Sequence, residues 1–157
     1  MSNKALNIEL KLLSLGVLSL GIVNLAAAIK IDSYLAENPN KCTNSDLRRS
    51  NSALLVTSSF LVALSLSYLT CSYSCDKGSN SLFARIFAKY NPYTYGVLIS
   101  CISVVLLVYG SIIYDKSKNC ESIKHSVGIV FGSSLISLII ALLMILLMYL
   151  NKNKKKD

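Results

Sequence analysis

Four long stretches of the chain are almost free of charge, and short polar segments separate them. They cover residues 12–30, 51–73, 93–114 and 126–150. A helix rises about 1.5 Å per residue, so about 20 apolar residues cross a hydrocarbon layer about 30 Å thick. The fourth stretch is followed at once by a lysine cluster, which is typical of a cytoplasmic flank. The pattern predicts an all-α membrane protein, with residues 1–157 forming one up-down bundle of four transmembrane helices.

The segment between the second and third stretches has a different pattern. Over residues 81–90, apolar and aromatic side chains recur on one helical face, with Arg85 and Lys89 on the other, before Asn91-Pro92 ends the run. A basic amphipathic helix between two spans is expected to lie in the headgroup plane. We therefore predict a short interfacial helix here, with an ordinary connecting loop as the alternative.

Small and polar residues recur inside every span at spacings of three, four or seven. Helices in lipid associate through small residues and interhelical hydrogen bonds, so such faces predict helix packing. The packing residues that we select are Asn24, Gly96, Gly110, Gly128 and Gly132. The faces are Ser14-Val17-Gly21-Asn24-Ala28, Ser59-Ala63-Ser67-Cys71-Cys75, Gly96-Ser103-Gly110 and Ser133-Ser137-Ala141 beside the Gly128–Gly132 GxxxG. For Asn24, the alternative is a pore or ligand contact.

The fourth span carries two of these tracks. At 100° per residue, Gly128 and Gly132 are offset from Ser133 and Ser137 by about 140° around the helix axis. One track can therefore pack inside the bundle while the other meets a second molecule.

The five cysteines fall into three groups. Cys42 and Cys120 lie in two different loops on the predicted outer side, where a disulfide between them is reasonable, and two free thiols are the alternative. Cys71 and Cys75 lie at a membrane exit, which favours either lipidation or plain packing. Cys101 lies at membrane depth. With His125 as the only histidine, we expect no metal site, and we expect no cofactor.

The net charge of +8 comes from basic residues at the ends of the apolar runs. That placement is typical of membrane anchors, so lipids and not nucleic acid are the expected partners. The basic tail and second loop predict that both termini are cytoplasmic. Lys154 and Lys155 match a dilysine retrieval signal of the endoplasmic reticulum, with a simple basic stop as the alternative. Tyr73, Tyr93, Tyr95, Tyr114 and Tyr149 are expected at the membrane interfaces.

Charged residues are absent from the interior of the four spans, which disfavours ion-coupled transport and voltage sensing. No nucleophile is paired with a base, and no glycine-rich phosphate loop is present, so we expect no enzyme. The four-span layout resembles that of tetraspanins, claudins and MARVEL proteins as a hydropathy pattern. The Cys-Cys-Gly motif of tetraspanins and the tryptophan-and-cysteine signature of claudins are absent, so no family function carries over.

These observations favour a structural membrane protein that packs laterally with copies of itself or with other membrane or capsid-type proteins. A virus membrane under a protein shell, or an endoplasmic-reticulum-type membrane, would be a suitable setting. The alternative is a small oligomeric channel lined by serine, threonine and asparagine faces.

Overall fold

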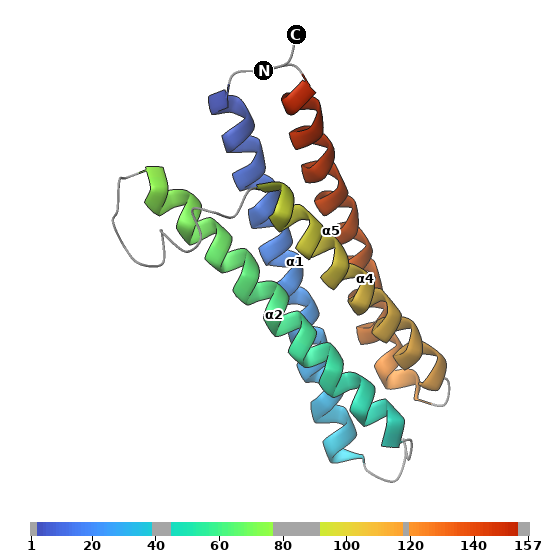
Figure 1. Cartoon of the computed structure of the whole chain (residues 1–157). Helices are drawn as coiled ribbons and strands as arrows, with labels where there is room; N and C mark the ends of the chain where they lie inside the picture. Colours follow the sequence, from blue (N-terminus) through green and yellow to red (C-terminus); the bar gives the residue numbers. More distant parts are fainter. Residues whose placement is uncertain (1–2, 39–44, 77–91, 118–119, 154–157) are drawn as a thin grey trace.

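The computed structural model describes residues 3–38, 45–76, 92–117 and 120–153, and nearly all of them are helical. The helices are α1 (Asn3–Glu37), α2 (Ser45–Asp76), α4 (Pro92–Lys116) and α5 (Glu121–Asn153) (Figure 1). No strand occurs within these four ranges. The predicted interfacial helix at 81–90 lies outside the described residues.

All four helices are long and apolar enough to cross a membrane, which confirms this part of the sequence prediction. The candidate spans are Leu6–Glu37, Leu47–Thr70, Tyr93–Lys116 and Ile123–Asn151. Each helix continues beyond its uncharged stretch, because a charged residue stops the apolar run without stopping the backbone hydrogen bonds. Pro92 begins α4, where its fixed φ suits the first helical turn and its missing N–H is not needed.

The helices form a ring in which each packs against two neighbours, in the order α1, α2, α4, α5 and back to α1. Neighbours in this ring run antiparallel, as the residue pairs in contact show (Figure 1). Between α1 and α2, Asn51 bonds to the carbonyl of Ala28, and Val62 lies against Gly21. The pairs between α4 and α5 are Gly96 with Ile145 and Gly110 with Val130.

The buried residues of each helix recur every three and four positions, which is the heptad spacing of a coiled coil. A strict seven-residue repeat keeps one seam of a helix facing its partners and favours a left-handed bundle with shallow crossing angles. The seams are Leu10-Ser14-Val17-Gly21-Asn24-Ala28-Ile31-Leu35, Leu47-Asn51-Leu54-Ser58-Leu61-Ser65, Gly96-Ile99-Ser103-Leu106-Gly110-Ile113-Ser117 and Cys120-Ile123-Val127-Val130-Ser134-Ser137-Ala141-Met144.

The interior of the bundle contains polar as well as apolar side chains. Among the residues that the structure describes, the buried polar ones are ten serines and two asparagines, including Asn24 and Asn51, which are fully buried. The outer faces instead expose large apolar side chains, such as Val56 at 68% and Phe60 at 63%. A soluble monomer rarely exposes contiguous apolar surface of this kind, whereas lipid tails solvate it well. The distribution of polarity therefore suits a bilayer.

At the end of the bundle that carries both chain termini, α1 and α5 continue past α2 and α4 (Figure 1). Leu6 and Leu10 are still buried there, at 7% and 3% exposure. Because Gly96 in the first turn of α4 already lies against Ile145, the last turns of α5 extend beyond the start of α4. The first turns of α1 and the last turns of α5 form a two-helix extension.

Candidate helix-packing sites

Asn24 links α1 to α5 in the middle of the bundle. Its side-chain oxygen accepts a hydrogen bond from the Ser133 hydroxyl at 2.5 Å, and its Nδ2 donates to the Ser134 oxygen at 3.3 Å. Ser133 also donates to the carbonyl of Ile129, one turn earlier in its own helix. Asn24 is fully buried, so within the described structure it serves as a contact between helices.

A second asparagine, which the sequence analysis did not select, links α1 to α2. Asn51 Nδ2 donates to the carbonyl of Ala28 at 3.3 Å and lies 3.4 Å from Oδ1 of Asp32. Asn51 is also fully buried. The sequence contains a signal for Asn51, because it lies seven residues before Ser58 and fourteen before Ser65. That spacing is the one by which Gly96, Ser103 and Gly110 were selected.

The small-residue face predicted on α2 does not face the interior of the bundle. Ser59 and Ala63 are exposed, and the hydroxyls of Ser59 and Ser67 donate to carbonyls four residues earlier in their own helix. The inward face consists of Asn51, Leu54, Ser58, Leu61 and Ser65. Small residues permit close approach of helices, but they do not require it, so a small-residue track alone cannot tell the inside of a bundle from the outside.

Two glycines of the bundle interior permit close backbone approach. A Cβ at Gly96 would stand 2.9 Å from Cγ1 of Ile145 and 3.4 Å from the backbone oxygen of Ala141. At Gly21, a Cβ would stand 3.1 Å from Cγ2 of Val62. Gly110 is also buried, but its nearest neighbour would be Val130 at 3.7 Å, an ordinary contact.

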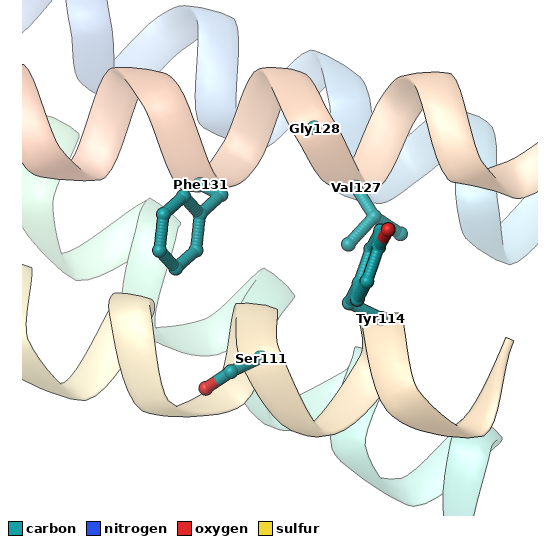
Figure 2. A pocket seen from close by; sticks show the side chains of 5 residues that line it. All are labelled: Ser111, Tyr114, Val127, Gly128 and Phe131. Atoms are coloured by element: carbon teal, nitrogen blue, oxygen red, sulfur yellow. The ribbon is translucent and has the colours of Figure 1, made fainter.

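Gly128 and Gly132 lie on the opposite side of α5 from these contacts. A Cβ at either position would meet nothing within 4 Å, and Gly128 is exposed. Beside Gly128, a pocket of about 250 Å³ opens between α4 and α5. Figure 2 shows it between the rings of Phe131 and Tyr114, with Ser111 on the α4 side. By contrast, Ser133, Ser137 and Ala141 are buried in the bundle.

Two tyrosines stack within the bundle. The rings of Tyr68 and Tyr95 lie 4.0 Å apart and are tilted by 11°. Tyr95 is only 2% exposed, which differs from the interfacial position that the sequence suggested. Its hydroxyl faces those of Ser14 and Ser65 without hydrogen-bond geometry to either. Tyr93, Tyr114 and Tyr149 are exposed, as residues of an interfacial belt would be.

The cysteines are only partly described. Cys42 lies outside the described residues, and the side chains of Cys71 and Cys75, both in α2, are also outside what is described. Cys120 is buried beside the start of α5, and its side chain has an interaction partner. Cys101 is an exposed free thiol. Within the described ranges, no group of three or more histidine, cysteine or acidic residues is arranged to hold a metal ion.

Replacing Asn24 with leucine is expected to destabilise the bundle by about 0.6–2 kcal/mol, the value of an interhelical hydrogen-bond contact in a membrane. Ser134 would lose its bond to Asn24, while Ser133 would keep its bond to Ile129. The free energy of unfolding in mixed detergent micelles measures the effect. Asn7→Leu, at an exposed position on the same helix, is the matched control. If the two variants are equally stable, Asn24 does not stabilise the bundle.

Comparison with known proteins provides no relative for this chain. No family model, curated protein or solved structure matches it. The class of protein therefore rests on the fold alone. The chain is all-helical over the described residues, and its four helices are long and apolar enough for a multi-pass membrane helical bundle.

Proposed function

We propose that this protein is a structural component of a membrane, which assembles laterally through the Gly128–Gly132 face of α5. The observation that carries the proposal is the division of small residues on α5 between two sides. Ser133, Ser137 and Ala141 are buried in the bundle, whereas Gly128 and Gly132 have open space beside them. A GxxxG face that its own bundle leaves open is suited to the close approach of another helix.

The shape of this face favours a second copy of the same chain as the partner. Phe131 projects from α5 with 45% of its surface exposed, and the pocket lies next to it, beside Gly128 (Figure 2). A two-fold contact places the same patch on both sides, so one patch must carry both a protrusion and a recess. Phe131 supplies the protrusion, and the pocket between Phe131 and Tyr114 supplies the recess.

The interior of one bundle is less suited to the alternative function, an ion channel. A conducting lumen needs polar surface that continues from one face of the membrane to the other. Here the buried polar residues alternate with large apolar side chains, including Leu54, Leu61 and Leu106, which are fully buried. A channel would therefore have to form between several copies and not within one.

In the proposed arrangement, the four helices cross the membrane alternately up and down, and both termini face the cytoplasm. The tail lysines and the basic loop between α2 and α4 would then meet anionic headgroups or an adjacent protein layer, such as a viral capsid. A dilysine-type address in the tail, and so an endoplasmic-reticulum-type membrane, is compatible with this orientation. The support is the distribution of basic residues along the sequence.

The test replaces Gly132 with leucine. Because a Cβ at this position would meet nothing within 4 Å, the variant is expected to fold and insert normally. It is expected to lose self-association, since leucine would hold the second helix away. Energy transfer between donor- and acceptor-labelled copies in lipid vesicles measures association, and an ion-flux assay is run on the same vesicles.

Ser19→Leu is the matched control, because Ser19 is exposed on α1 and its hydroxyl bonds only to the carbonyl of Leu15. It adds the same side chain to a lipid-facing surface outside the proposed contact and is expected to leave association unchanged. Undiminished association of the Gly132→Leu protein would refute the proposed face. If that result came with a lost ion conductance, the channel would be the better function.

A further inference from the structure

The middle of the bundle holds a layer of buried polar side chains to which all four helices contribute. They are Asn24 of α1, Ser58 of α2, Ser103 of α4 and Ser137 of α5, and each is fully buried. Asn24 is bonded to Ser133 and Ser134. The hydroxyls of Ser58, Ser103 and Ser137 have no hydrogen-bond partner among the described residues.

The register of the helices places these groups within about one helical turn of each other along the bundle axis. Between α4 and α5, Gly96 lies against Ala141 and Ile145, and Gly110 against Val130, so Ser103 falls opposite Ser137. The contacts of α1 with α2 likewise bring Ser58 to the level of Asn24. Ser134, which bonds to Asn24, precedes Ser137 by about one turn. Each residue also lies near the middle of its candidate span.

The unpartnered hydroxyls differ from other serines of the same helices. In an apolar setting a serine commonly donates to the carbonyl four residues earlier in its own helix. Ser59 on α2 and Ser100 on α4 bond in this way, whereas Ser58 and Ser103 do not. The heptad position of Ser58, Ser103 and Ser137 directs them toward the bundle axis. A buried hydroxyl without a protein partner usually bonds to an ordered water.

We propose that the centre of this bundle binds ordered water, with the hydroxyls of Ser58, Ser103 and Ser137 as its hydrogen-bonding partners. A buried water molecule needs two to four polar partners, and this layer supplies them from three different helices. Asn24 extends the layer, because its Nδ2 group carries two hydrogens and its bond to Ser134 uses one.

Apolar side chains close the site on both sides. Toward the termini lie Val17, Leu61 and Ile99, and toward the other end lie Leu54, Leu106 and Val130, all of them fully buried. The water is therefore held at the midplane and does not form a file that crosses the membrane. Bound water of this kind satisfies the polar layer and helps to fix the register of the four helices.

The test compares Ser103→Ala, Ser137→Ala and the double variant by thermal unfolding of the full chain in nanodiscs. If water bridges the two hydroxyls, each single change is expected to lower Tm by about 2–4 °C. The double variant is then expected to lose clearly less than the sum, because both hydroxyls hold the same water. An unpartnered hydroxyl in a dry interior is unfavourable, so a dry layer predicts that each alanine leaves Tm unchanged or raises it. Either of those results, or strict additivity, overturns the proposal.

Ser59→Ala is the matched control, because its hydroxyl bonds to Leu55 of its own helix on the exposed side of α2. It is expected to leave Tm unchanged. A second measurement needs no variant. In NMR spectra of the wild-type protein, the amides of Ser103 and Ser137 are expected to show cross-peaks to water, whereas that of the lipid-facing Val105 is not. Absence of water contact at both serines also overturns the proposal.

Discussion

Replacing Gly96 with leucine is expected to destabilise the bundle by about 3 kcal/mol. Even a Cβ at this position would lie 2.9 Å from Ile145, and the backbone oxygen of Ala141 lies close behind at 3.4 Å. A side chain can turn away, but the backbone of α5 cannot move without separating the two helices. Overpacking of this kind typically costs 1–3 kcal/mol, and a full leucine belongs at the upper end. Unfolding in mixed micelles measures the change.

Gly128→Leu is the control for Gly96→Leu. Both changes replace a helical glycine with leucine in the same helix pair, but Gly128 has open space around it. The stability of a single bundle is therefore expected to stay the same or to rise slightly, since leucine is the better helix former. If the two variants lose equal stability, the cause is not the close contact between α4 and α5.

The second large effect is expected from Cys120. In a protein isolated without reductant, Cys120→Ser is expected to lower the free energy of unfolding by about 2–4 kcal/mol, because we propose a disulfide to Cys42 that closes a long loop. The end of α1 and the start of α5 lie at the same end of the bundle (Figure 1). Cys120 is buried at that end.

Reductant provides the internal check. It is expected to weaken the wild-type protein by the same amount and to leave the Cys120→Ser protein unaffected. Cys101→Ser, which removes an exposed free thiol, is expected to change nothing. Peptide mapping without reduction identifies the pair directly. Recovery of Cys42 and Cys120 as free thiols from a protein kept under oxidising conditions would contradict the bridge.

The existence and approximate position of the four helices could be predicted from the sequence, but their full lengths could not, and the orientation of each helix about its axis could be predicted only in part. On α1, the stripe from Ser14 to Ala28 that the spacing selected is buried as a whole. Its glycine, asparagine and alanine contrast with large apolar neighbours such as Ile22 and Val23, which are exposed. This contrast allowed the inward face of α1 to be predicted from the sequence.

On α2, the contrast fails because small polar residues occur on both sides of the helix. Ser58 and Ser59 are neighbours in sequence, and the first is buried while the second is exposed. Hydropathy cannot tell the buried serine from the exposed one. Lipid tails are as apolar as the leucines of the interior, so both faces of the helix have an apolar environment. The seven-residue recurrence of Asn51, Ser58 and Ser65 carries the missing information. Contacts such as that of Asn51 with Ala28 depend on the partner helix and need the structure.

The two-helix extension of α1 and α5 has a consequence for how other molecules meet this protein. A helix of 35 residues is about 52 Å long, well beyond the hydrocarbon thickness of about 30 Å, whereas the 25 residues of α4 reach only about 37 Å. In a bilayer, a helix as long as α1 is therefore expected to reach beyond the acyl chains, with the two-helix extension toward the membrane surface. Because these turns of α1 and α5 lie side by side, labels attached to Asn7 and Asn151 are expected to be close to each other on the same side of the membrane (Figure 1).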